Sequence, residues 1–277
     1  MKTVVLPGGE RVPALGLGTW NMGDDAARRH DELAALRRGL DLGATLIDTA
    51  EMYGDGRAEE LVADAIAGRR DETFIVSKVY PHNATRRGLP LACERSLQRL
   101  RTDRIDLYLL HWRGNVPLAE TLTALQELQR AGKIRHYGVS NLDLADLREW
   151  LALPGGDSVQ TDQVLYNLSR RGIEWDLLPW LRERRIPVMA YSPLEQARLF
   201  GHHPLAALAR DLGATPAQVA LAWLLRHDDV IVIPKSSSPA RVAENIGALD
   251  FTLSPEHLAA LDAIFPPPTK AMPLEML

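Results

Sequence analysis

The stretch that decides the fold is Thr45-Leu46-Ile47-Asp48-Thr49-Ala50-Glu51-Met52-Tyr53. Its apolar run ends in the carboxylate of Asp48, and a tyrosine follows five residues later. Three apolar runs downstream also end in polar side chains, at Lys78, His111 and Ser140. Strands that are apolar throughout are typical of a parallel sheet covered on both faces. The pattern therefore favours parallel strands surrounded by helices.

Eight such runs occur along the chain, and their polar ends are evenly spaced. The intervals between these ends are 29, 30, 33, 29, 23, 28 and 44 residues. A βα unit of about 30 residues, repeated eight times, has the size of a (β/α)₈ barrel. The long last interval indicates an extra loop and short helix around residues 195–212. The eight polar ends are Thr19, Asp48, Lys78, His111, Ser140, Gln163, Tyr191 and Lys235.

Helical periodicity fills the intervals between the expected strands. The expected strands are 14–20, 44–47, 73–76, 105–110, 134–139, 159–161, 187–190 and 230–233. The expected helices are 33–42, 58–67, 89–100, 118–131, 144–151, 175–184, 216–226, 239–246 and 255–264. Residues 3–6 and 11–13 flank Gly8-Gly9 as a hairpin. We therefore expect one domain over residues 1–277, a (β/α)₈ TIM barrel with an N-terminal β-hairpin and extra C-terminal helices. A doubly wound sheet is the competing architecture, but no G-x-G-x-x-G follows an early strand.

Composition narrows the class of protein. The 277 residues are 46% hydrophobic and 25% charged, which is ordinary for a soluble enzyme. The net charge of −4 gives no case for nucleic-acid or membrane binding. The lone cysteine, Cys93, excludes a disulfide within the chain and is expected to be inert packing. With neither a signal-peptide core nor a membrane-length apolar run, we expect a cytoplasmic protein, with a monomer favoured.

Polar side chains at the strand ends are candidates for chemistry, because the strand carboxyl ends form the functional face of such barrels. Asp48 and Lys78 end neighbouring strands at the same level, so the carboxylate is expected to hold a buried ammonium. Tyr53 lies in the loop after Asp48. A free phenol has a pKa of about 10, and a nearby lysine is expected to lower it toward a value useful in acid catalysis.

His111 completes the set as a group that could donate a hydrogen bond to a substrate carbonyl. Each residue alone has a structural explanation: a turn cap, a snorkelling lysine, a tyrosine that packs a loop, or a core histidine. Together they form a proton donor, the cation that adjusts its pKa, the counter-ion of that cation and a carbonyl director. None of them can carry a hydride, so the set requires a cofactor.

With these residues the sequence resembles the aldo-keto reductase superfamily over essentially its whole length. The resemblance implies a barrel that reduces aldehydes and ketones with NADPH, with no metal. It also implies a catalytic tetrad of Asp48, Tyr53, Lys78 and His111, in which Tyr53 is the acid. The matching stretches are Gly16–Trp20, Leu46–Tyr53, Val76–Lys78, Asp106–Trp112, Gly132–Arg135, Gly138–Asn141, Ala190–Leu194 and Ile233–Ser236.

The resemblance implies cofactor and substrate contacts as well. The nicotinamide would be bordered by Gly18, Thr19, Trp20 and Asp48, its carboxamide would be bound by Ser140, Asn141 and Gln163, and its ring would stack on Tyr191. The pyrophosphate would be lined by Ser192 and Leu194. The 2′-phosphate would be held by Lys235, Ser236 and Arg241, with Glu244 and Asn245 near the adenine. Trp20, Tyr53, His111 and Trp112 would line the substrate pocket.

The residues from Lys235 to Arg241 by themselves also indicate a phosphate site. Lys235 is followed by three serines and a helix with Arg241 in its first turn, and hydroxyls, cations and a helix N-terminus together form an anion site. This predicts a preference for NADPH over NADH.

The sequence is also similar to small bacterial members of the superfamily that are linked to methylglyoxal reduction. The similarity lies in residues 153–156, 163–167 and 173–180. The loop after Leu194 and the tail after Phe265, where family members differ, are short or unusual. They predict an open pocket for a small-molecule carbonyl substrate.

Two other classes of function remain open at this point. A non-catalytic NADPH-binding sensor or regulatory subunit would keep the cofactor residues, although the complete tetrad argues against it. A metal-dependent barrel hydrolase would need several histidine and carboxylate ligands at the strand ends. Here His111 stands alone, with Lys78 nearby.

Overall fold

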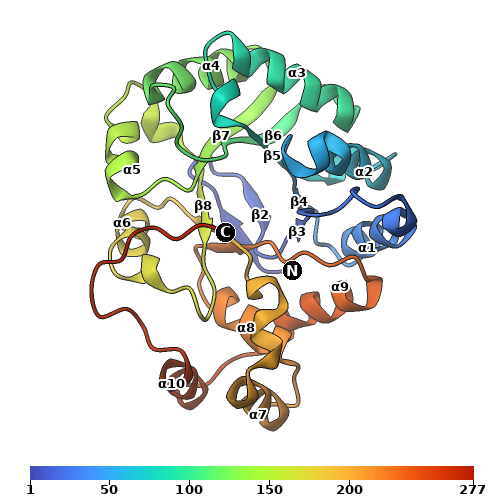
Figure 1. The fold of residues 1–277 in the computed structure, drawn as a ribbon, viewed down its shortest axis with the longest axis vertical. Helices are drawn as coiled ribbons and strands as arrows, with labels where there is room; N and C mark the ends of the chain where they lie inside the picture. The colour runs from blue at the N-terminus through green and yellow to red at the C-terminus, as the bar shows by residue number, and fades with distance from the viewer.

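Eight parallel strands form one sheet in sequence order in the computed structural model, which describes residues 1–277. Bridges between Leu15 and Val232 and between Gly18 and Lys235 join the first strand to the last and close the sheet into a barrel. Figure 1 shows the helices arranged around it. The (β/α)₈ prediction is therefore confirmed. The strands are β3 (Leu17–Gly18), β4 (Leu46–Asp48), β5 (Phe74–Val79), β6 (Ile105–Leu110), β7 (Ile134–Ser140), β8 (Asp162–Leu165), β9 (Val188–Tyr191) and β10 (Val230–Val232).

The helices cover the strands with apolar faces. They are α1 (Arg29–Asp41), α2 (Arg57–Ala65), α3 (Gly88–Leu100), α4 (Leu118–Arg130), α5 (Leu144–Leu151), α6 (Leu177–Glu183), α7 (His203–Asp211), α8 (Pro216–Leu225), α9 (Pro239–Ile246) and α10 (Pro255–Ile264). The predicted insertion before α8 is confirmed as a 3-10 helix, η7 (Glu195–Gly201), and α7. None of the helices combines the length and hydropathy needed to cross a bilayer. Burial raises the pKa of the Cys93 thiol on α3 to about 12, consistent with inert packing.

Several predicted elements differ from the structure in their bounds, and the first helix and the sixth barrel strand bear most on the site. The first helix begins at Arg29 rather than Leu33, because its polar first turn is anchored when Glu32 accepts a hydrogen bond from the Gly23 backbone at 2.9 Å. The sixth barrel strand is β8, residues 162–165, rather than 159–161. The strand pairs Val139 with Asp162, so Gln163 lies inside β8 instead of beyond its end.

An antiparallel hairpin, β1 (Thr3–Val5) with β2 (Arg11–Pro13), covers the amino ends of the barrel strands. Lys2 Nζ donates to the carbonyl oxygens of Leu225 and His227, just before β10, at 2.6 and 3.0 Å. The Gly8 backbone donates to Gln160 Oε1, just before β8, at 2.8 Å. The predicted hairpin is thus confirmed, and because it covers this end, the opposite end carries the pocket described below.

One carboxyl in β8 is buried with poor hydrogen bonding. Asp162 is fully buried, and neither of its oxygens accepts a well-aligned hydrogen bond. Burial raises the pKa of Asp162 well above its usual range, and the carboxylates of Asp146 and Asp143 add to this, while the backbone of Leu142 opposes it. The fold therefore favours the neutral form of this carboxyl up to a higher pH than the unfolded chain does.

We expect Asp162→Asn to increase the free energy of unfolding, and the gain to grow with pH. The folded state binds this proton more tightly than the unfolded chain, so wild-type stability falls as pH rises above the unfolded pKa of about 4. Asparagine has no such proton to lose. Urea unfolding at about pH 5 and about pH 8 measures the difference, since each tenfold change in proton affinity is worth about 1.4 kcal/mol. An equal effect at both pH values would contradict a neutral buried carboxyl.

Candidate active site

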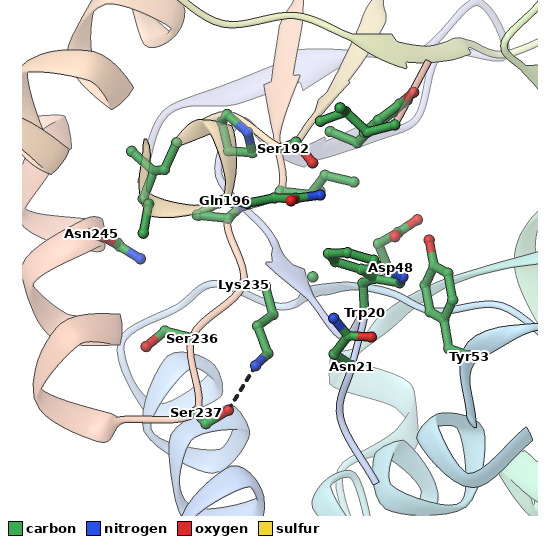
Figure 2. Close-up of a pocket in the computed structure, with 18 of the residues that line it drawn as sticks. Trp20, Asn21, Asp48, Tyr53, Ser192, Gln196, Lys235, Ser236, Ser237 and Asn245 are labelled. Carbon is green, nitrogen blue, oxygen red and sulfur yellow. Dashed lines mark hydrogen bonds between the residues drawn. The ribbon is translucent and has the colours of Figure 1, made fainter. Parts of the chain in front are cut away.

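A pocket of about 950 Å³ opens at the carboxyl ends of the strands. It extends from Tyr53 and His111 at one end to Lys235 and Arg241 at the other. Figure 2 shows Trp20, Asp48 and Tyr53 on one side of the pocket and Ser236 and Ser237 on the other. The pocket is therefore an elongated groove across the barrel mouth.

Lys78 forms the centre of the catalytic end. Its side chain is fully buried, and its ammonium donates to Asp48 Oδ2 at 2.8 Å, Thr49 O at 2.9 Å and Tyr53 Oη at 3.1 Å. These three bonds use all the donors of the ammonium. Burial lowers the pKa of Lys78, but the charge of Asp48 and the hydrogen bonds to Asp48 and Tyr53 oppose this and leave the pKa above its usual value. The lysine therefore stays charged, as the sequence pairing of Asp48 with Lys78 predicted.

Asp48 is held from two sides. Its Oδ2 accepts from Lys78, and its Oδ1 accepts from Gln163 Nε2 at 2.7 Å. The side chain is only 3% exposed. Both carboxylate oxygens of this buried side chain therefore accept a hydrogen bond. Gln163, expected at the carboxamide of a cofactor, thus also orients the counter-ion of Lys78.

Tyr53 begins a 3-10 turn, η2 (Tyr53–Gly56), in which Gly54, Asp55 and Gly56 have φ of 59°, 53° and 91°. This left-handed run turns the chain sharply and leaves the phenol against Lys78. Burial raises the pKa of Tyr53 above its usual value, and Lys78 lowers it only in part. Lys78 thus lowers the pKa as expected, but the net pKa is not lowered, because removing water from a phenolate costs more than one cation returns. Tyr53 is protonated near neutral pH, as a proton donor must be.

His111 follows β6 and faces Tyr53, with ring centroids 5.8 Å apart in an edge-to-face arrangement. Burial, with a contribution from the Lys78 charge, lowers the pKa of His111 to about 2. The imidazole is therefore neutral at physiological pH and can donate a hydrogen bond without carrying charge. Its neighbour Trp112 also lines the pocket, and the ring centroids of Trp112 and His111 lie 4.8 Å apart.

A chain of hydrogen bonds connects the next polar residues along the groove. Ser140 Oγ donates to the Gln163 carbonyl at 2.8 Å, and Asn141 Nδ2 donates to Ser140 Oγ and to the His111 carbonyl, both at 3.1 Å. Tyr191 Oη donates to Asn141 Oδ1 at 3.0 Å. These side chains belong to or directly follow β7 and β9, and they bind backbone carbonyls of or just after β6 and β8, so the barrel itself orients them before any ligand binds.

The far end of the groove is basic. Lys235, Arg241 and Arg28 all line the pocket, and none forms a salt bridge. Lys235 Nζ donates to Ser237 Oγ at 2.9 Å (Figure 2). Arg28 Nη2 donates to the same oxygen at 3.1 Å. The N-terminus of α9, capped by Ser238, opens here. Cations without carboxylate partners, hydroxyls and a helix N-terminus fit a phosphate group.

Close backbone packing shapes the wall between the two ends. A Cβ on Gly18 would lie 2.8 Å from the carbonyl oxygen of Ile233, so only glycine fits there. Nearly all the predicted cofactor residues line the pocket. Thr19 does not; it is fully buried, and its hydroxyl donates to the Asp48 carbonyl at 2.9 Å. The sequence analysis expected Thr19 to border the cofactor, but its side chain lies behind the residues that line the pocket.

Sequence reasoning missed several lining residues. Arg28 ends a short polar 3-10 helix, η1 (Ala26–Arg28), just before α1, and no motif marks it. Gln196 and Ala197 belong to η7, and Met276 and Leu277 to the tail. The tail therefore folds back to form one wall of the groove, a contribution that the sequence analysis did not predict. The glutamate just before Met276 gave the only sequence signal for this, as a possible ion-pair partner.

Comparisons with known proteins agree with this geometry. The model of the aldo/keto reductase family matches residues 14–265. Methylglyoxal reductase YeaE of Escherichia coli is 49% identical, over 100% of this chain and 99% of its own length. Glyoxal reductase of Bacillus subtilis is 33% identical, over 95% and 92%.

One solved structure has nearly the same fold as this chain. The aldo-keto reductase of Klebsiella pneumoniae, crystallised with NADPH, has a TM-score of 0.97 and 52% identity, with 100% of this chain and 99% of that chain covered. The match of the family over most of the chain agrees with the resemblance seen in the sequence. This chain belongs to the aldo/keto reductase family.

Proposed function

We propose that this protein reduces small aldehydes and ketones to alcohols with NADPH, and that Tyr53 is the general acid. The observation that carries the proposal is the contact of one fully buried ammonium, Lys78 Nζ, with both Asp48 and Tyr53, at 2.8 and 3.1 Å. A cation that touches the proton donor stabilises the negative charge left on that donor. Such a device serves a reaction in which charge develops on a carbonyl oxygen.

The residues of the groove fit NADPH along its length. Lys235, Ser236 and Arg241 would hold the 2′-phosphate, with Arg28 as an added cation, and Glu244 and Asn245 would lie by the adenine. At the other end, Gly18, Trp20, Ser140, Asn141, Gln163 and Tyr191 would hold the nicotinamide, with Ser192 and Leu194 between. When bound there, the cofactor supplies the hydride that reduces the carbonyl carbon.

The protein residues manage the proton and the orientation. Tyr53 and His111 would both hydrogen-bond the carbonyl oxygen, since their rings lie 5.8 Å apart at the catalytic end. As negative charge grows on that oxygen, Tyr53 donates its proton. Lys78 stabilises the phenolate that remains, and Asp48 and Gln163 keep the lysine in place. Neutral His111 fixes the direction of the carbonyl without competing for the proton.

The substrate end favours a small carbonyl compound. Besides Tyr53 and His111, it is lined by Trp20, Met52, Trp112, Met276 and Leu277, none of which has a charged side chain. The similarity to methylglyoxal and glyoxal reductases adds support for short dicarbonyl substrates. Methylglyoxal is our first candidate.

Steady-state turnover tests the function directly. NADPH absorbance would be followed with methylglyoxal, an aromatic aldehyde, an aldose and a keto acid, and again with NADH. The proposal requires turnover of at least one small uncharged aldehyde. NADPH binding without any turnover would instead favour the sensor or regulatory subunit.

We expect Arg241→Ala to raise the KM for NADPH far more than the KM for NADH. Arg241 faces the proposed 2′-phosphate, which only NADPH carries, and a hydrogen bond to a charged group is worth about 1.5–3 kcal/mol. That range corresponds to roughly a tenfold to hundredfold change in affinity. Parallel KM titrations with the two nicotinamides measure it. Equal effects on both would reject the assignment of Arg241 to the phosphate.

A further inference from the structure

Two walls of the pocket come from segments outside the barrel strands. One is η7, after β9, and the other is the tail after α10. In Figure 1 the tail runs from α10 past α6 and ends over the middle of the barrel. Figure 2 shows Gln196 of η7 lying between Ser192 and Lys235. The lining residues from these two segments are Gln196, Ala197, Phe200, Met276 and Leu277.

Arg170 binds both segments. Its Nε and Nη2 donate to Glu195 Oε1 in η7 at 3.1 and 2.9 Å, and its Nη1 donates to Glu275 Oε1 in the tail at 2.6 Å. Glu195 is 5% exposed at its side chain, and Glu275 is 38% exposed. A guanidinium has donors on several edges, so a single arginine can hold two carboxylates at once. Arg170 itself does not line the pocket.

A tight turn after β8 fixes the position of Arg170. Asn167, fully buried, accepts from the backbone of Ser169 and Arg170 through Oδ1 at 2.9 and 3.1 Å. Its Nδ2 donates to Glu195 Oε2 at 2.8 Å and to the Ser192 carbonyl at 2.9 Å. The arginine and the glutamate are thus tied to the same turn, and the turn is tied to the barrel.

The held segment has an unfavourable backbone. Glu195, Gln196 and Ala197 have φ of 49°, 53° and 69°, three consecutive left-handed residues that are not glycine. Each of them disfavours this conformation because of its Cβ. Contacts to the Glu195 carboxylate must therefore compensate. Burial raises the pKa of Glu195, but Arg170 and Asn167 outweigh it and keep the group charged.

We propose that Arg170 is a positioning residue that sets both outer walls of the pocket. Through Glu195 it holds η7 against the cofactor part, and through Glu275 it holds the tail against the substrate part. The backbone of Leu277 lies beside the phenol of Tyr191, so the tail ends where the proposed nicotinamide site meets the substrate. The roles of the two walls rest on the proposed function. Kinetics should then separate the two ion pairs: the Arg170–Glu275 pair affects substrate binding, and the Arg170–Glu195 pair affects cofactor binding.

The test compares four variants of the full-length protein. Glu275→Gln should raise the KM for methylglyoxal by about threefold to tenfold, with kcat and the NADPH Kd unchanged. Glu195→Gln should raise the NADPH Kd, and Arg170→Met should raise both constants. Arg198→Gln is the matched control: Arg198 donates to the same Glu195 oxygen at 2.9 Å but does not contact the tail. It should leave the substrate KM unchanged.

Hydrogen exchange of the tail gives a readout that needs no turnover. Amides of residues 266–277 should exchange faster in Arg170→Met and Glu275→Gln than in wild type, and at the wild-type rate in Arg198→Gln. Unchanged KM and unchanged exchange in Glu275→Gln would overturn the proposal, as would equal effects of Arg198→Gln. A wild-type protein without NADPH oxidation would reject the proposed function, while tail exchange would still decide whether Arg170 positions the tail.

Discussion

Tyr53→Phe is expected to lower kcat by about 10²–10⁴-fold while NADPH affinity remains unchanged, because general acid catalysis is typically worth that much. The substitution removes one oxygen, the atom that lies 3.1 Å from Lys78 Nζ. The ring stays in place at the edge of the His111 ring. Stopped-flow or steady-state measurement of NADPH absorbance gives kcat, and NADPH fluorescence titration gives the cofactor Kd.

A second Tyr→Phe variant controls for the loss of a buried hydroxyl. Tyr108 on β6 is fully buried, and its hydroxyl has no hydrogen-bond partner. Tyr108→Phe should therefore keep wild-type kcat and wild-type stability or better, since it removes an unpaired polar atom. Turnover of Tyr53→Phe close to that of Tyr108→Phe would exclude Tyr53 as the proton donor.

Lys78→Met is expected to have the largest effect on stability. Removing one partner of a buried ion pair typically costs about 3–5 kcal/mol, because the other charge is left buried without compensation. Here Asp48 would keep only Gln163, and Tyr53 would lose its cation. Urea unfolding should show the loss of stability, and NADPH absorbance should show a loss of turnover.

The double variant Lys78→Met with Asp48→Asn separates the two consequences. Once the unpaired charge of Asp48 is removed, most of the lost free energy of unfolding should return, since the effects of substituting contacting residues are strongly non-additive. Turnover should not return, because no cation then stabilises the Tyr53 phenolate. If Lys78→Met unfolds at the wild-type urea concentration, the buried ion pair described above is not a determinant of stability.

The fold followed from the sequence because its signals are local. Apolar runs ending in Asp48, Lys78 and His111 recur at βα spacing, and this periodicity specifies strands between helices without knowledge of distant contacts. The bounds failed where the signal was weak. The polar turn from Arg29 lacks apolar residues, and β8 begins at Asp162, a residue type that buried strands rarely contain.

The catalytic end was also predictable, because parallel strands bring their carboxyl ends to one level. Asp48 pairs in register with Val76, two residues before Lys78, so the two side chains point into the same mouth. The sequence did not reveal the balance of energies there. Whether Lys78 outweighs burial at Tyr53 depends on how much water the fold removes, and only the packed structure determines that.

By itself, the sequence determined the barrel, the residues at its mouth and the family to which the chain belongs. The tertiary structure alone decided what surrounds them: Gln163 on Asp48, Arg28 beside Lys235, and the tail over the pocket. These contacts join residues more than a hundred positions apart, as with Arg170 and Glu275, 105 positions apart. No local pattern encodes such pairs, because nothing in the neighbouring sequence distinguishes either side chain from any other polar residue.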